Sequence, residues 1–428
     1  MLSTGHEFVY DDSKERMPPE ERENWLNQRL AQIMEYAYKN APAIKDKFDK
    51  AGVAPSEIRS VKDLGKLPVT RKDELVRLQN ENPPFGGFLA VPLNRLKRIY
   101  ISPGPIYDAI AGSPEGQNVL AKQLWMAGMR PGDIAIDSMG FHMVPAGLAM
   151  VDMLDLLGVT VIPAGAGQSE LQVRIIRDLK PTWYLGFPSF LVTLIKRAEE
   201  MGYDVRRDFT IRHAFCLGER HLQVLRKSLE EDYNIDTWQN YGTADVGIIA
   251  YECEQKSGMH YADEDMIVEV VDPDTGKQLG PGEVGEAVVT LFSQTYPLIR
   301  FGTGDLTSFT DEPCPCGRTS PRLTAILGMI GDHVRAKGMF IHLRELDEAM
   351  SKFPEISKYQ MALSLSGHKD VITLRLEPKE PGVDEEPLSQ AVIKSCKEAF
   401  RLTVDKIDFL PKGALPEDYK KFEDTRWG

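Results

Sequence analysis

The sequence has little cysteine and no long apolar run, and both absences limit its class. Five cysteines in 428 residues are an odd and low number, which excludes a disulfide framework. Two of them, Cys216 and Cys396, lie in apolar surroundings and are expected to be buried. No apolar stretch approaches the roughly 20 residues that span a bilayer, and the first residues lack the pattern of a secretory signal. We therefore expect a cytoplasmic protein without a membrane partner.

Positive charge is also scarce. The chain carries 51 basic against 64 acidic residues, a net charge of -13, and has no basic run or basic and aromatic stripe. Nucleic acid is therefore not an expected partner. ATP remains compatible with this composition, because phosphate sites depend on local backbone amides and a cation rather than on net charge. Internal repeats and a Ser-His-Asp arrangement are missing as well.

Helical stretches and short apolar runs alternate along the middle of the chain. The apolar runs, which we predict to be strands, cover residues 134–139, 159–163, 183–187, 214–217 and 236–241. The predicted helices cover residues 119–129, 147–157, 171–179 and 222–233. Such alternation is typical of βαβ units around a mostly parallel sheet, in which ligands bind beyond the carboxyl ends of the strands.

Other patterns flank this part. Residues 20–80 read as mostly helical, and residues 266–292 read as strand, turn and strand. After Gly331 the predicted helices are 343–353 and 388–402, and the predicted strands are 359–365, 371–376 and 406–410. The predicted fold class is α/β. A large domain over residues 1–331, with mostly parallel sheets and a β-rich segment, precedes a small, mobile α+β domain over residues 332–428.

Three cysteines and one histidine form a candidate metal set in the β-rich segment. Cys253 and His260 are separated by six residues, and Cys314 and Cys316 lie further along in a Cys-Pro-Cys-Gly-Arg turn. Three thiolates and one imidazole are the closed tetrahedral set expected of structural Zn²⁺. The alternative is three unpaired cysteines and a surface histidine.

Several phrases, in this order and spacing, resemble one family. They are YAYKNAPAIKDKF, PPFGGFLAVP, YGTADVG, IRFGTGDLT, CPCGR followed by ILGMIGDHVRAKG, and GALPEDYKK. Over nearly the whole chain they resemble the phenylacetate-CoA ligase branch of the adenylate-forming superfamily, which also holds acyl-CoA synthetases and luciferases. The resemblance implies an enzyme that uses ATP and Mg²⁺ to convert a carboxylic acid into an acyl-adenylate. The acyl group then passes to a thiol such as coenzyme A.

The resemblance implies that the nucleotide lies against residues that follow predicted strands. The implied set is Ser102, Gly104, Gly218, Glu219, Tyr241, Gly242, Thr243 and Asp305. In the family, the position of Tyr241 faces the adenine, that of Thr243 reaches the phosphate, and that of Asp305 accepts hydrogen bonds from the ribose. Asp245 stands where the family usually has a Glu that holds Mg²⁺. Read locally, these stretches could also be a strand-to-loop turn with Asp245 as an N-cap and a Gly-Asp turn at Asp305.

The end of the chain resembles the mobile part of the family. Lys421, with Lys420 beside it, matches the lysine that bridges the substrate carboxylate and the α-phosphate during adenylation. Asp332 matches the hinge residue, and Lys337 and Gly338 match the loop that faces the active site in the thioester-forming state. Rotation about Asp332 would exchange Lys421 for this loop. Read locally, a lysine so near the end could be a solvated, frayed charge.

The expected phosphate loop departs from the family's pattern. The family's loop is rich in Ser, Thr and Gly, whereas this chain has YISPGPIYDAIAG. Only Ser102 and Gly104 keep the expected chemistry, and Pro103 and Pro105 each remove a backbone donor.

A second departure concerns the ribose. Met329 stands where the family usually has a ribose-binding Arg, for which Arg318 or Arg335 would have to substitute. Both losses support a non-catalytic binding protein as an alternative function.

The acyl pocket is expected between the strand ends, near Phe141, His142 and Phe187. An aromatic lining favours an aryl or arylacetic acid, although His142 could instead be a core histidine. The predicted function is that of an AMP-forming acid-thiol ligase with the acid, ATP and coenzyme A as its partners, and the resemblance suggests a homodimer. The alternatives are an acceptor other than coenzyme A, or the binding protein.

Overall fold

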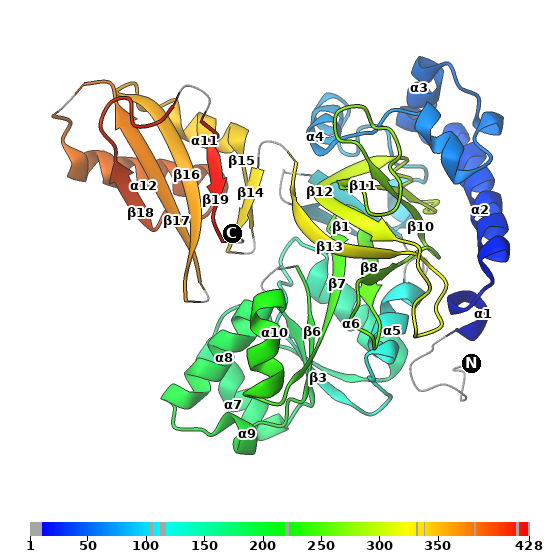
Figure 1. Ribbon diagram of the computed structural model, residues 1–428, viewed down its shortest axis with the longest axis horizontal. Coiled ribbons are helices and arrows are strands. Elements are labelled where there is room, and N and C mark those ends of the chain that lie inside the picture. The colour runs from blue at the N-terminus through cyan, green and yellow to red at the C-terminus, as the bar shows by residue number, and fades with distance from the viewer. Residues whose placement is uncertain are drawn as a thin grey trace. The chain divides into compact units, whose positions relative to one another are not determined.

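The alternating middle of the chain folds as a parallel half-sheet in the computed structural model, which describes residues 11–102, 106–111, 117–218, 222–330, 333–337, 339–367, 369–380, 382–416 and 419–426. The strands of this half are β4 (Thr160–Pro163), β3 (Ile134–Asp137), β5 (Trp183–Gly186), β6 (His213–Cys216) and β7 (Asp236–Thr243), in that spatial order (Figure 1). All neighbouring pairs are parallel, which confirms the predicted alternation.

Helices cover both faces of this half-sheet. They are α5 (Gln117–Met126), α6 (Ala146–Leu157), α7 (Ser169–Leu179), α8 (Pro188–Glu200), α9 (Val205–Asp208) and α10 (Leu222–Glu231). Met150 and Leu154 of α6 pack on one face, while Ile176 of α7 and Leu191 of α8 belong to the core on the other. Burial on both faces explains why these strands are continuous apolar runs rather than alternating ones.

The β-rich segment continues the same sheet with antiparallel strands. From β7 outward these are β8 (Gly247–Glu252), β9 (Met259–Tyr261), β13 (Arg322–Met329), β12 (Phe301–Thr310), β11 (Gly285–Leu291) and β10 (Met266–Val271). The fold class is α/β as predicted, but its main sheet is mixed: parallel order applies to one half only.

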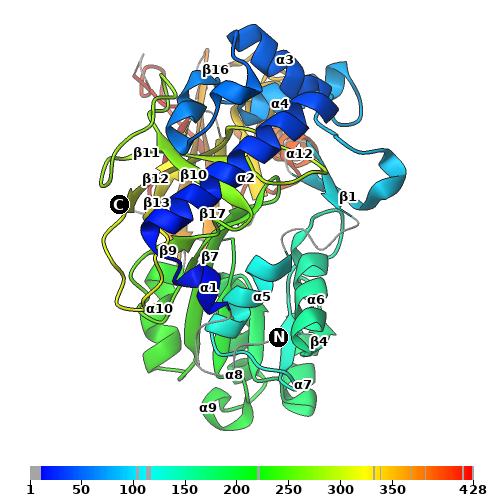
Figure 2. The same ribbon diagram turned by 90° about the vertical axis from the view of Figure 1, so that its right-hand side faces the viewer.

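Helices from the first part of the chain cover the antiparallel half. They are α1 (Asp12–Glu15), α2 (Pro19–Asn40), α3 (Pro42–Ala51) and α4 (Lys72–Glu81), with short 3-10 turns η1 (Pro55–Glu57), η2 (Val61–Lys66) and η3 (Leu93–Arg95). Leu30, Ile33, Met34 and Ala37 form the buried stripe of α2 at helical spacing. Figure 2 shows α2 lying across the antiparallel strands.

A hairpin connects these helices to the parallel half. β1 (Leu96–Ser102) pairs antiparallel with β2 (Ile106–Ala111), and Ser102 lies opposite Ile106. Ser102 and Ile106 therefore pair across the segment in which the phosphate loop was expected.

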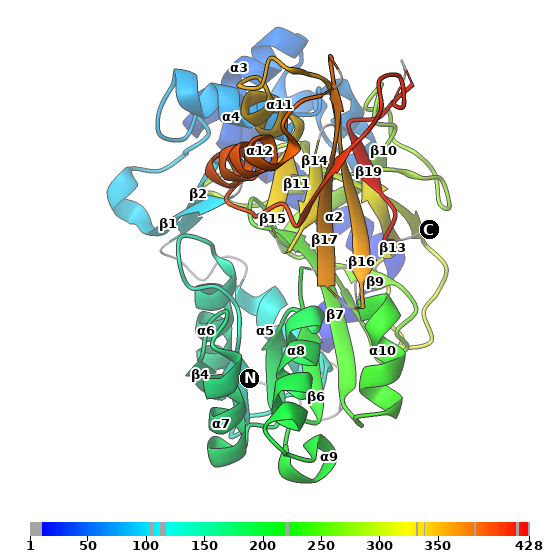
Figure 3. The same ribbon diagram turned by 90° about the vertical axis from the view of Figure 1, so that its left-hand side faces the viewer.

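The chain divides into two compact units, Met1–Gly328 and Met329–Gly428. The second contains a sheet in the order β18 (Lys406–Phe409), β17 (Lys369–Pro378), β16 (Ile356–Ser366) and β19 (Phe422–Asp424), and a hairpin of β14 (His333–Ala336) and β15 (Met339–His342). Its helices α11 (Leu343–Met350) and α12 (Glu385–Phe400) lie side by side (Figure 3). Within the described ranges, no helix is long and apolar enough to cross a bilayer.

Candidate active site and metal cluster

Two strands far apart in sequence bring two expected nucleotide residues, Tyr241 and Asp305, together with Thr303. Tyr241, on β7, donates a hydrogen bond from its Oη to Asp305 Oδ2 at 2.9 Å, and Thr303 Oγ1 lies 3.1 Å from the same hydroxyl. Burial, and to a smaller extent the charge of Asp305, raise the pKa of Tyr241 well above its usual value. The hydroxyl therefore remains a donor. Asp305 lies inside β12, so the local interpretation as a turn between strands is wrong.

The turn between β7 and β8 places Asp245 beside a lysine. Asp245 Oδ2 lies 2.9 Å from Lys72 Nζ at the start of α4. β8 rather than a helix follows, so the N-cap interpretation of Asp245 is wrong. Gly242 is required here, because a Cβ atom would lie 2.4 Å from the carbonyl oxygen of Gly247. Among the described residues, neither Thr243 Oγ1 nor Asp245 Oδ1 has a hydrogen-bond partner.

Sequence reasoning missed two charged residues of this cluster, Lys72 and Asp108. Although burial lowers the pKa of Lys72, the charge of Asp245, with smaller contributions from Asp305 and Asp108, raises it above its usual value. Asp108, on β2, is buried, and its burial and the charge of Asp245 raise its pKa well above the usual range. No local pattern identifies either residue, because their place in the cluster depends on the pairing of β1 with β2 and on the contact of α4 with the turn after β7.

The remaining nucleotide residues fall in different places. Ser102 is buried at the end of β1, and its hydroxyl lies 3.5 Å from the Ile106 carbonyl oxygen. Gly218 follows β6 with a positive φ of 70°, which glycine adopts without strain. Gly104, Glu219, Asp332 and Gly338 lie outside the described residues.

The residues expected to line the acyl pocket flank the ends of β3 and β5. Phe141 packs beside Gly147, where a Cβ atom would lie 3.1 Å from the ring. Phe187 precedes α8 and packs against the core that contains α6. His142 is exposed, so the interpretation as a core histidine is wrong. Whether Phe141, His142 and Phe187 contact an acid stays a prediction.

The four candidate zinc ligands converge. The ligand atoms of Cys253, His260, Cys314 and Cys316 all lie within 4.8 Å of one another, and all four residues are buried. Cys253 Sγ is 3.7 Å from Cys314 Sγ, and Cys316 Sγ is 3.3 Å from His260 Nε2. His260 Nδ1 lies 3.0 Å from the Ser320 carbonyl oxygen, which leaves Nε2 toward the thiols. The donor set fits Zn²⁺, and the alternative of a surface histidine is wrong.

Buried ion pairs connect this cluster to the start of the chain. Arg318, two residues after Cys316, donates from Nε to Glu15 Oε2 at 2.6 Å and pairs with Glu254 at 3.0 Å. Its side chain is about 1% exposed. Arg318 is therefore committed to these two acids beside the Cys/His cluster and does not substitute for the missing ribose-binding Arg.

The second unit holds its two expected lysines in ion pairs. Lys421 Nζ lies 2.8 Å from Asp347 Oδ1 on α11 and 3.1 Å from Tyr359 Oη on β16. The Lys421 carbonyl accepts a hydrogen bond from the Met361 amide at 2.8 Å, directly before β19. The interpretation as a frayed terminal charge is therefore wrong. Lys337 Nζ pairs with Asp405 Oδ1 at 2.7 Å.

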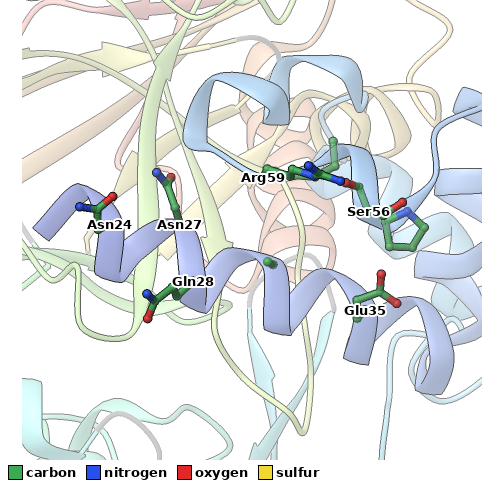
Figure 4. Close-up of a pocket in the computed structure, with 9 residues that line it drawn as sticks. Asn24, Asn27, Gln28, Glu35, Ser56 and Arg59 are labelled. Carbon is green, nitrogen blue, oxygen red and sulfur yellow. The ribbon is translucent and has the colours of Figure 1, made fainter. Parts of the chain in front are cut away.

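A surface pocket of about 550 Å³ lies elsewhere in the first unit, between α2 and η1. Figure 4 shows Asn24, Asn27 and Gln28 of α2 along it, with Arg59 beyond η1. None of the residues expected to bind nucleotide, acid or metal lines this pocket.

Comparison with known proteins gives close curated relatives, whereas no family model matches. Phenylacetate-coenzyme A ligase of Thermus thermophilus is 30% identical over 402 residues, which cover 91% of this chain and 89% of the relative. Phenylacetate-coenzyme A ligase of Escherichia coli K12 is 32% identical over 365 residues and 82% of each chain. This chain belongs to the phenylacetate-coenzyme A ligase family.

A solved structure agrees with this family assignment. 2-Hydroxyisobutyryl-CoA ligase, in complex with its acyl-adenylate and coenzyme A, superimposes with a TM-score of 0.91 at 25% identity, over 100% of this chain and 94% of that one. The resemblance to the phenylacetate-CoA ligase branch is confirmed, and so are the α/β fold class and the prediction of an AMP-forming acid-thiol ligase.

Proposed function

We propose that this chain activates an aryl or arylacetic acid with ATP, releases pyrophosphate, and transfers the acyl group from the adenylate to coenzyme A. The observation that carries this proposal is the hydrogen-bonded set of Tyr241, Thr303 and Asp305 beside the Lys72–Asp245 ion pair. It combines an aromatic face, a carboxylate for a diol and a half-buried cation, at the end of a parallel strand where α/β folds bind ligands.

Asp245 and Thr243 fit Mg²⁺, which prefers oxygen ligands. Asp245 Oδ1 and Thr243 Oγ1 have no hydrogen-bond partner within the described part of the chain, so they can coordinate a metal ion without breaking another bond. Mg²⁺, when bound, offsets the charge of the nucleotide phosphates. Zn²⁺ held by the buried cluster would serve the fold, since three thiolates and an imidazole leave no open position for a substrate.

Lys421 supplies a cation to the adenylation step in this proposal. Its partner Asp347 is 41% exposed and Lys421 itself 33% exposed, and such pairs contribute about 0.2 to 1 kcal/mol. Leaving Asp347 therefore costs little. Beside the reacting carboxylate, the lysine ammonium would stabilise negative charge that develops between carboxylate oxygen and phosphorus. Coenzyme A then attacks the mixed anhydride as a thiolate, and AMP is the leaving group.

The β1–β2 hairpin favours the second candidate, a binding protein without catalysis. Ser102 pairs with Ile106, and the three residues between them in the sequence are Pro-Gly-Pro, of which Gly104 alone carries a backbone N–H. Pyrophosphate would have few backbone donors in such a loop.

An assay of AMP release separates the candidates. The purified chain is incubated with ATP, Mg²⁺, coenzyme A and a panel of aryl, arylacetic and short-chain acids. We expect acid-dependent AMP that requires coenzyme A for turnover, and Lys421→Ala should lower it by about 10²-fold or more. Lys420→Ala is the matched control and should retain activity. AMP without dependence on coenzyme A would indicate another acceptor, and no acid-dependent AMP would favour the binding protein.

A further inference from the structure

Gln79, a buried residue of α4, holds the backbone of one residue in the β1–β2 hairpin. Its Nε2 donates to the Tyr107 carbonyl oxygen at 2.9 Å, and the Tyr107 amide donates to its Oε1 at 2.8 Å. Nε2 also donates to Tyr296 Oη at 3.0 Å. A primary amide has two N–H donors on its nitrogen and an oxygen that accepts. All of these groups are used here, and Gln79 is only 3% exposed.

The contact with Gln79 lies on the outer edge of β2. Tyr107 lies opposite Ile101 of β1. In an antiparallel pair, alternate positions turn their backbone N–H and C=O groups away from the partner strand, and those of Tyr107 reach Gln79. On the other edge of the hairpin, the Ile101 amide donates to the Met143 carbonyl oxygen, in the loop between β3 and α6, at 2.7 Å. The hairpin is therefore held at one level from both sides.

The start of α4 is attached to the strands of the candidate active site. Thr70, two residues before α4, exchanges backbone hydrogen bonds with the beginning of β12. Its amide donates to the Arg300 carbonyl oxygen at 2.8 Å, and its carbonyl oxygen accepts from the Gly302 amide at 2.9 Å. Lys72 then contacts Asp245 at 2.9 Å. The first turn of α4 is therefore fixed relative to β12 and to the turn after β7.

One face of α4 connects the two attachment points. Lys72, Leu75, Val76 and Gln79 are spaced at i, i+3, i+4 and i+7, so they share a face of the helix. Leu75 and Val76 between the two ends are buried in the core. Seven residues of α-helix span about 10 Å. The turn that carries Asp245 and the β1–β2 hairpin are therefore held by the two ends of one packed helix face.

We propose that Gln79 is a positioning residue for adenylation, which sets where the hairpin and its Ser102 lie relative to the nucleotide residues on β7 and β12. The inference rests on the proposed function, because it takes Ser102 as a residue that contacts the phosphates. Pyrophosphate leaves during adenylation, and the thioester step starts from the acyl-adenylate. Gln79 is therefore needed for the first half-reaction and not for the second.

The two half-reactions separate a positioning role from a general loss of structure. Adenylation is measured as acid-dependent exchange of labelled pyrophosphate into ATP, with the acid that gives the most AMP with wild type. Thioester formation is measured from preformed acyl-adenylate and coenzyme A. Gln79→Met removes all three hydrogen bonds and nearly keeps the side-chain volume. It should raise the KM for ATP and lower kcat/KM for exchange by about tenfold or more, while thioester formation stays within about threefold of wild type.

Two further variants accompany Gln79→Met. Gln278→Met is the matched control, because Gln278 also donates to a backbone carbonyl oxygen distant in sequence, that of Val61 at 2.7 Å. Both of its half-reactions should proceed at wild-type rates. Gln79→Asn keeps an amide but is one methylene shorter, so it should show the same selective loss. It carries the test if Gln79→Met does not fold.

Hydrogen exchange tests the contact without activity. Peptides that cover β2 should take up deuterium faster in Gln79→Met than in wild type, because the Tyr107 amide loses its acceptor. Unchanged uptake in β2, wild-type adenylation in Gln79→Met, or an equal loss in both half-reactions would overturn the inference. Absence of acid-dependent pyrophosphate exchange in wild type would instead refute the proposed function, so the two failures are distinguishable.

Discussion

Asp137 offers a test of the electrostatics of the parallel half-sheet. It is the last residue of β3 and fully buried. Its Oδ1 accepts a hydrogen bond from the Met139 amide at 2.9 Å, whereas Oδ2 has no partner in the described part of the chain. Burial raises the pKa of Asp137 from 3.8 to about 7, although the Met139 hydrogen bond opposes the shift. Asp137→Asn keeps the acceptor for Met139 and removes the ionisation.

The sign of the effect follows from the raised pKa. Folding favours the neutral acid, so its contribution to stability is fully present below the unfolded pKa of 3.8 and is lost as the pH rises toward about 7. At 1.36 kcal/mol per pKa unit, the rise from pH 5 to pH 7 costs wild type about 2.7 kcal/mol relative to Asp137→Asn. With an unfolding entropy of about 2.1 cal/mol/K per residue, this corresponds to about 4 °C for the unit Met1–Gly328.

Differential scanning calorimetry at pH 5, 6, 7 and 8 measures this change. The melting temperature of wild type minus that of Asp137→Asn should fall by about 4 °C between pH 5 and pH 7 and then level off. The buried amide of the variant adds a constant offset, which cancels when two pH values are compared. A difference that does not change with pH would refute the reasoning, since it would mean that Asp137 ionises as easily in the folded as in the unfolded chain.

Three further predictions concern the metal cluster and the second unit. Cys314→Ser should lose Zn²⁺ by metal analysis and lower the free energy of unfolding by about 4 kcal/mol or more, as loss of a structural metal does; unchanged stability with Zn²⁺ lost would exclude a structural role. Arg318→Met should cost about 3 to 5 kcal/mol, because the buried Glu15 carboxylate loses its ion pair with Arg318. Adding Glu15→Gln should recover part of this loss in a calorimetric double-mutant cycle, and full additivity would contradict the pairing. Given preformed acyl-adenylate and coenzyme A, Lys421→Ala should form thioester within about threefold of the wild-type rate, since its cation acts on adenylation; an equal loss in both half-reactions would argue against this role.

Structural features that depend only on the residue types within one segment were predictable from the sequence. Strands buried on both faces must be apolar throughout, so β5 and β6 could be found without a structure. The convergence of the Cys/His cluster was predictable for another reason. Cys and His have few other uses in such a combination, so residue type alone selected Cys253, His260, Cys314 and Cys316.

Features that depend on long-range pairing were not predictable. The Lys72–Asp245 contact joins α4 to the turn after β7, and nothing in the sequence of either segment indicates that the two are neighbours. Asp108 was hidden because β1 and β2 pair where a loop was expected. The sequence around Asp305 is also compatible with a turn, and only the pairing of β11 with β12 shows that Asp305 lies within a strand. Residue spacing describes one element at a time, whereas these sites depend on which elements become neighbours in the sheet.

The contact between Glu15 and Arg318 also fixes when the fold can be completed. The two residues are 303 positions apart, so during synthesis Glu15 cannot pair with Arg318 until most of the first unit has left the ribosome. At about 5 to 20 residues per second, that wait is roughly 15 to 60 s. Closing so long a loop carries a large entropic cost before any contact is gained. The start of the chain should therefore be the last part of the first unit to acquire protection from proteolysis, and its protection should appear together with metal uptake.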